Sequence, residues 1–240
     1  MNHKINQGLA CFALLLAVGI AASWVRAEGE EDQDESQEEG WDIVFDGTGT
    51  DSLRDFRTDD FPKEGWTIEE DGSLRAVHGA RDIVTRKQYS DFDLRMEWNL
   101  GKGANSGIMY RVAQRGNHPH DSGPEYQIID DARIHMSSTG SLYGLIKPND
   151  KAKIKPAGEW NSSRIVMKDN QVQHYLNGDL IVEYVWGSDD IKARLKRSKF
   201  RNWKGYMQQE TGFIGFQSHG KDLRLRNIKI KDLSDEGADE

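Results

Sequence analysis

The sequence contains a single cysteine, Cys11, and only five prolines in 240 residues. One cysteine excludes an internal disulfide and any metal cage built from several thiolates. The chain also lacks a GxGxxG nucleotide loop, a Walker phosphate loop, a GxSxG nucleophile elbow and an HExxH zinc motif. The sequence therefore excludes the classes of active site that these motifs mark.

The first 27 residues have the composition of a signal peptide. Lys4 supplies a positive start, residues 9–25 are almost wholly apolar, and the run ends on small residues at the positions that a signal peptidase reads. We predict a signal peptide over residues 1–27, cleaved after Ala27, and an exported protein in the periplasm or outside the cell. No membrane partner is then expected. The alternative is a membrane anchor, because about 17 apolar residues can just span a bilayer.

Acidic residues are concentrated in two short segments. Residues 28–39 contain eight acids and residues 234–240 contain four, with no basic or large apolar side chain. Such segments cannot bury a core, so both are predicted to be disordered, and the folded domain is predicted to span residues 40–233. The formal charge of −8 belongs to these tails, since 28 acids and 30 bases remain in the domain. No nucleic-acid partner is expected, and a neutral sugar suits the domain.

Between these tails the apolar pattern has a period of two residues. From Phe92 to Trp98, apolar residues alternate with charged ones, which is typical of a half-buried strand. Asn177-Gly178 predicts a two-residue hairpin turn. Only residues 188–204 could hold a short helix. Many short strands joined by glycine-rich turns predict an all-β fold, an antiparallel sandwich or barrel.

Three strands carry polar residues on a face that is neither plainly core nor plainly solvent. The shared faces are Asn105-Gly107-Met109-Arg111, Glu125-Gln127 and Phe213-Gly215-Gln217-His219. Amides and arginine offer paired donors and acceptors, and glycine makes room, so these faces predict a cleft for a hydroxyl-rich ligand. The alternative is that they face solvent.

Histidines and basic residues give weaker signals. His118, His120 and Asp121 could ligate a metal, although three such residues in one loop are more often solvated. The isolated His78, His135 and His174 are predicted to be surface or strand residues. The basic stretch 192–204 could favour an anionic partner, but a solvated helix or loop face is the preferred interpretation.

The order of several segments resembles one known family. These segments are GPEYQIID, TGSLYGL, GEWNSSRIV, HYLNGDLIVEY, SKF and GFIGFQSHGKDLRLRNIKIKDL. They resemble the family of 3-keto-disaccharide hydrolase domains, and the resemblance covers residues 41–233. It implies a concanavalin A-like β-sandwich, a jelly roll with a concave sugar-binding sheet. It also implies cleavage of glycosides whose sugar is oxidised at C3, with a small carbohydrate as the only partner.

A ketone at C3 acidifies the C2 proton, so the implied chemistry needs a base, donors around an oxyanion and an acid at the leaving oxygen. We predict Glu125, His219 and Arg111 as the catalytic residues, with Glu125 or His219 moving the proton. The predicted substrate-binding residues are Asn105, Gln127, Asp130, Tyr143, Trp160, Lys199, Gln217 and Arg226. A structural ion pair is the alternative role for Lys199 and for Arg226.

No cofactor is predicted, although a divalent ion on Glu125 or Asp130 as a Lewis acid is left open. Two alternatives to an enzyme also stay open at this point. A carbohydrate-binding module without catalysis has the same lectin-like sandwich. An accessory domain that docks on a partner is the third interpretation.

Overall fold

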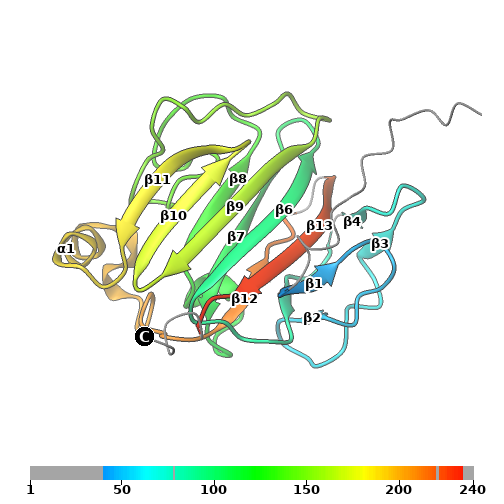
Figure 1. Cartoon of the computed structure of the whole chain (residues 1–240), viewed down its shortest axis with the longest axis horizontal. Helices are drawn as coiled ribbons and strands as arrows, with labels where there is room; N and C mark the ends of the chain where they lie inside the picture. Colours follow the sequence, from blue (N-terminus) through cyan, green and yellow to red (C-terminus); the bar gives the residue numbers. More distant parts are fainter. Residues whose placement is uncertain (1–39, 78, 220–221, 235–240) are drawn as a thin grey trace, which may run out of the picture. The chain divides into compact units, whose positions relative to one another are not determined.

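The computed structural model describes residues 40–77, 79–219 and 222–234 (Figure 1). The predicted signal peptide, the acidic arm and all of the predicted tail except Ser234 lie outside these residues, as does His78. The described residues belong to one compact unit, Glu38–Glu240. Within them, no helix has the length and apolar character needed to cross a membrane.

The larger of two sheets has eight strands. They are β1 (Trp41–Phe45), β3 (Trp66–Ile68), β4 (Leu74–Ala76), β6 (Phe92–Leu100), β9 (Asn161–Lys168), β10 (Gln171–Leu176), β11 (Asp179–Val185) and β13 (Leu223–Asp232). Their order is β11-β10-β9-β6-β13-β4-β3, and β1 also pairs with β13. Every pairing is antiparallel.

The smaller sheet has five strands, and it forms a second layer behind β6, β9 and β10 in the view of Figure 1. They are β2 (Leu53–Asp55), β5 (Ile83–Thr85), β7 (Asn105–Val112), β8 (Glu125–Ile129) and β12 (Phe213–Phe216). The order β2-β5-β12-β7-β8 is again antiparallel throughout. The prediction of an all-β antiparallel sandwich is confirmed.

The core lies between the two sheets because each strand turns its alternate apolar residues inward. On β6 the apolar side chains Phe92, Leu94, Met96 and Trp98 are all buried. The indole N–H of Trp98 donates to Ser163 Oγ over 2.8 Å, and that hydroxyl donates to the phenol of Tyr126 over 2.9 Å. Since Tyr126 belongs to β8, this chain of hydrogen bonds joins the two sheets through their core.

The predicted hairpin turn and the predicted helix are both present in the structure. Asn177 and Gly178 both have positive φ, 50° and 91°, as a two-residue hairpin turn between β10 and β11 requires. The predicted helical stretch 188–204 contains α1 (Asp189–Arg197) and the 3-10 helix η3 (Lys199–Asn202). The hydroxyl of Ser188 caps α1 by accepting from the N–H of Ile191.

Candidate active site

A pocket of about 180 Å³ lies on the outer face of the smaller sheet. Its floor comes from Asn105 of β7, from Glu125 and Gln127 of β8 and from Gln217, which follows β12. Residues such as Ile108 and Tyr126 point the other way and are buried in the core. The 3-10 helix η3 and the segment after it form the facing wall. The lining residues are Asn105, His120, Glu125, Gln127, Tyr143, Lys199, Phe200, Trp203, Tyr206, Gln217 and His219.

Glu125 lies on the floor of this pocket. The residue is 8% exposed, and its carboxyl group has no hydrogen-bond partner within the described part of the chain. Burial raises the pKa of Glu125 to about 7; Lys199 opposes this change, and the charge of Asp82 adds to it. A carboxyl group with a pKa near 7 gives and takes protons readily at neutral pH. Glu125 is therefore suited to act as a general base or acid.

Amide side chains surround this carboxyl group. Asn105 and Gln217 line the pocket, and neither side chain hydrogen-bonds any other residue that the structure describes. Gln127 is 4% exposed and accepts from the N–H of Ile128 over 3.1 Å, which leaves its amide N–H groups unused. Because largely buried polar groups are normally paired, these amides are available to a ligand rich in hydroxyl or carbonyl oxygens.

Aromatic rings form the facing wall. Phe200 and Tyr206 stack at 4.3 Å with an interplanar angle of 10°, and Trp203 packs its ring edge-on against both. The ammonium group of Lys199 lies 4.1 Å from the ring centroid of Tyr143. A carboxyl group, unpaired amides and an aromatic wall together suit a sugar, which has an apolar ring face and a polar rim.

The structure brings together seven of the eleven site residues that the sequence predicts. They are Asn105, Glu125, Gln127, Tyr143, Lys199, Gln217 and His219. Their convergence on one outer sheet face agrees with the alternation of β7, β8 and β12. Within the described residues, Lys199 has no salt bridge, so its contacts in the pocket do not include the alternative ion pair.

Arg111 does not line the pocket, and its prediction as a catalytic residue is not supported. A β-bulge places one extra residue of β7 opposite β12, since Met109 pairs with Gly215 and Val112 pairs with Phe213. Arg111 is the residue at this bulge, with φ of 48°. Its guanidinium turns away to donate to Ser90 O and to lie over Trp186.

Trp160 and Arg226 belong to the outer face of the other sheet. The guanidinium of Arg226 lies 4.1 Å from the ring centroid of Trp160 and forms an ion pair with Glu97 of β6. Neither residue lines this pocket, so the structure does not support their predicted contact with substrate. For Arg226 the alternative role, a structural ion pair, is the one observed.

Asp130 has a structural role at the end of β8. Its carboxylate accepts from the N–H of Gly103 over 2.7 Å, and its own N–H donates to Ala104 O over 3.0 Å. These bonds hold the turn between β6 and β7. Asp130 is absent from the lining of the pocket, so substrate binding and metal binding are both unsupported for it.

Four lining residues were not predicted: His120, Phe200, Trp203 and Tyr206. The signal for the last three is the interleaving of aromatic and basic residues in 199–206, which was interpreted as a solvated face. His120 was noticed only as part of a histidine-rich loop. It also borders a second pocket of about 280 Å³, which shares His120, Gln217 and His219 with the first.

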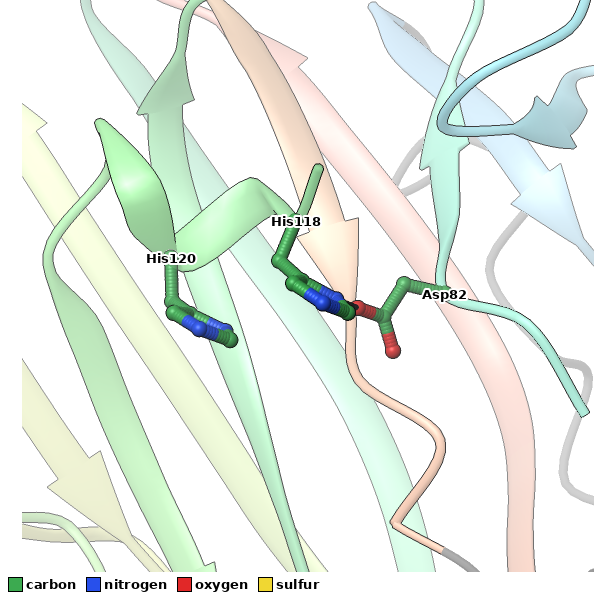
Figure 2. Close-up of side chains that lie close together, drawn as sticks. All are labelled: Asp82, His118 and His120. Carbon is green, nitrogen blue, oxygen red and sulfur yellow. Dashed lines mark hydrogen bonds and ion pairs between the residues drawn. The ribbon is translucent and has the colours of Figure 1, made fainter. Parts of the chain in front are cut away.

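The part of the chain that the structure describes contains one group of residues suited to a metal ion, formed by Asp82, His118 and His120 (Figure 2). Asp121, the acid predicted from the loop itself, is engaged elsewhere. Its Oδ2 accepts from the backbone N–H groups of Asn117 and His118 over 2.7 and 3.0 Å.

Comparison with known proteins identifies the family of this chain. The family of 3-keto-alpha-glucoside-1,2-lyase-like domains matches residues 40–231. The chain belongs to this family. A curated relative, the 3-keto-disaccharide hydrolase of Bacteroides thetaiotaomicron, is 31% identical over 254 aligned residues, which cover 91% of this chain and 87% of the relative. The resemblance stated above is confirmed, and so is the prediction of a glycoside-cleaving enzyme.

Two crystal structures from Parabacteroides distasonis share the fold, and both are of candidate glycosyl hydrolases. The first is 33% identical with a TM-score of 0.76 and covers 84% of this chain and 97% of its own. The second is 28% identical with a TM-score of 0.63 and covers 80% of this chain and 99% of its own. Both structures therefore share the fold of this chain along nearly their whole length.

Proposed function

We propose that this member of the family cleaves glycosides whose sugar ring carries a ketone at C3, with Glu125 as the base that takes the C2 proton. The observation that carries the proposal is the buried, unpaired carboxyl group of Glu125, whose pKa is raised to about 7, in a pocket lined by amides and aromatic rings. The name of the curated relative supports the same class of substrate. With the predicted signal peptide, the enzyme acts outside the cytoplasm.

The chemistry follows from the ketone. Removal of the C2 proton leaves an enolate whose charge resides on the C3 oxygen. The electron pair of the enolate then forms the C1–C2 double bond and restores the ketone as the C1–O bond breaks. The leaving oxygen takes a proton. Water then adds its hydroxyl to C1 and its proton to C2, so that the net reaction is hydrolysis. One carboxyl group suffices, whereas ordinary glycosidases need two at a fixed separation.

The pocket offers a group for each step. Glu125 accepts the C2 proton, and the cation of Lys199 together with the amide of Gln217 stabilises the enolate oxygen. His219, at the exposed rim, protonates the leaving oxygen. Trp203 offers its indole ring for packing against the apolar face of the sugar. Arg111 has no part in this assignment, because its guanidinium lies outside the pocket.

The test compares a 3-keto-glucoside with the parent glucoside that has a hydroxyl at C3. We expect release of the aglycone from the keto compound and at least about a hundredfold less from the parent, because only the ketone acidifies the C2 proton. In D2O the recovered 3-keto sugar should carry deuterium at C2, detected by mass spectrometry. Equal turnover of both substrates, or no deuterium at C2, would contradict the proposal. Binding without any turnover would favour a carbohydrate-binding module.

Gly107 gives a sharper test of the carboxyl position. A Cβ on Gly107 would clash with Oε1 of Glu125 and lie 2.7 Å from its Cγ, so Gly107→Ala must displace the carboxyl group. We expect kcat/KM to fall on the order of a hundredfold, which a displacement of about 1 Å can cause. Gly49→Ala is the matched control, because a Cβ at Gly49 meets nothing within 4 Å. Full activity in Gly107→Ala would show that Glu125 reacts from another position.

A further inference from the structure

The second pocket brings two histidines and an aspartate together from separate parts of the chain. Asp82 directly precedes β5, whereas His118 and His120 flank the first residue of the 3-10 helix η2 (Pro119–Asp121). Figure 2 shows the two imidazole rings side by side and Asp82 beyond His118. One ligand atom from each of the three lies within 4.8 Å of the others.

The loop that carries the histidines is fixed by its own contacts. Pro119 packs on Gly215 of β12, where a Cβ would lie 2.9 Å from the proline ring. Asp121 closes the loop by accepting the two N–H groups described above. Both imidazoles are therefore presented from a rigid turn on the same sheet face as the Glu125 pocket, and His120 borders both pockets.

The donor atoms are available. His120 Nδ1 is buried and has no hydrogen-bond partner within the described part of the chain, and the same holds for Ser218 Oγ in the same pocket. Asp82 Oδ1 accepts from the N–H of Ser218 over 3.0 Å, and Oδ2 lies 3.3 Å from Nδ1 of His118. The first bond orients the carboxylate, as the groups around a metal ligand usually do.

We propose that Asp82, His118 and His120 bind one divalent transition-metal ion at the border of the two pockets. Two imidazoles and one carboxylate suit Zn²⁺, Co²⁺, Mn²⁺ or Fe²⁺, whereas Mg²⁺ and Ca²⁺ prefer oxygen ligands alone. Ligand distances of about 2.0–2.2 Å require donor atoms at most about 4.4 Å apart. The three donor atoms already lie within 4.8 Å of one another, so small side-chain movements bring them within this limit.

This proposal deepens the proposed function and rests on it only for the role of the ion. Three protein ligands leave coordination positions open toward the cleft. Gln217 and His219 line both pockets, so a substrate in the first pocket can direct an oxygen toward the second. The expected ligands of the open positions are the ketone oxygen and a neighbouring hydroxyl of the sugar, which an ion polarises as a Lewis acid.

Metal binding is tested without turnover. The purified protein is treated with EDTA, dialysed and titrated with ZnCl2 and CoCl2 by isothermal calorimetry, and the cobalt form is also followed by visible absorption. We expect one ion per chain. His118→Ala, His120→Ala and Asp82→Asn should each weaken binding at least about tenfold, the smallest loss usual for a group that merely supports a ligand. His118→Ala is the safest variant for folding, because His118 is exposed.

His135→Ala is the matched control. His135 also lies beside a carboxylate, with Nε2 3.2 Å from Asp131 Oδ2, but it lines neither pocket. Its variant should bind the ion as the unchanged protein does. No stoichiometric binding, or binding that the three variants leave unaltered, would overturn the site. Turnover of the 3-keto-glucoside is measured on the same samples: binding without turnover removes the proposed function alone, and turnover without binding removes the metal site alone.

Discussion

Replacing Glu125 by glutamine should lower kcat for a 3-keto-glucoside on the order of a thousandfold, within the range that a general base contributes. Glutamine keeps the size and shape of the side chain but cannot accept a proton. Because Glu125 is buried and makes no hydrogen bond to another described residue, the change leaves no partner unsatisfied. Substrate affinity should change much less than kcat, which steady-state kinetics and equilibrium binding separate.

The pH profile of the unchanged enzyme supplies a second readout. Since the base must be ionised and the pKa of Glu125 is about 7, kcat/KM should rise as the pH increases through about 7. The titratable or charged groups around Glu125 are Asp82, His120, Tyr143, Lys199, Tyr206 and His219. Glu183→Gln, at an exposed position of β11, is the control and should leave both kcat and the profile unchanged. Near-normal kcat in Glu125→Gln would remove Glu125 as the base.

Alternation along three strands was enough to predict much of this site. It placed Asn105, Glu125 and Gln217 on outer faces, and the structure joins those faces because β7 lies between β8 and β12. The alternation could not predict that β7 and β12 are neighbours in the sheet, because about a hundred residues separate them in the sequence. The bulge that turns Arg111 away was hidden as well, because nothing around Arg111 marks a positive φ.

Errors at the other predicted residues have a similar cause. Trp160 and Arg226 were predicted from segments that resemble the family, and such segments do not say which sheet a strand joins. The structure places both residues on the outer face of the larger sheet. Asp82, the carboxylate of the proposed metal site, was not predicted because the sequence pattern does not show which strands and loops pack together. Asp82 and His118 are 36 positions apart and meet only through the packing of η2 on β12.

A buried histidine lies outside both pockets. His174 of β10 was predicted as a surface or strand residue and is fully buried. Its Nδ1 donates to Gly140 O over 2.9 Å, since a carbonyl only accepts, so Nε2 of the neutral ring accepts from the hydroxyl of Tyr110. Tyr184 then donates to Tyr110 over 2.6 Å. This chain supports the pocket, because the N–H of Gly140 also donates to Gln127 O.

Burial lowers the pKa of His174 from 6.5 to about 4. The unfolded chain therefore binds an extra proton between these pH values, and the free energy of unfolding falls as the pH falls from 6.5 to 4. The stabilisation is complete above pH 6.5, and a pKa difference of this size corresponds to about 3 kcal/mol. Glu125 acts in the opposite direction. Its pKa is raised from 4.5 to about 7, so the folded state holds the proton and loses stability as the pH rises through this range.

The two groups thus offset each other in the unchanged protein between about pH 4.5 and 6.5, and single variants should separate them. Relative to the unchanged protein, Glu125→Gln should gain about 3 kcal/mol in the free energy of unfolding as the pH rises from 4.5 to 7. His174→Gln, which can still donate to Gly140 O and accept from Tyr110, should show the same relative gain as the pH falls from 6.5 to 4. Urea denaturation followed by tryptophan fluorescence at each pH measures both.

Taking differences from the unchanged protein cancels the contribution of every other carboxyl group, and Glu183→Gln should show no pH-dependent difference. If the difference in unfolding free energy for His174→Gln does not change with pH, the imidazole takes up its proton in the folded state as it does in the unfolded chain. Nε2 would then have to donate to Tyr110, whose hydroxyl would accept instead of donating. A flat difference for Glu125→Gln would mean that the carboxyl group ionises as it does in water. Loss of catalysis combined with a gain in stability at pH 7 is the signature expected of a buried carboxyl group kept for reaction, because folding alone favours the neutral glutamine at that position.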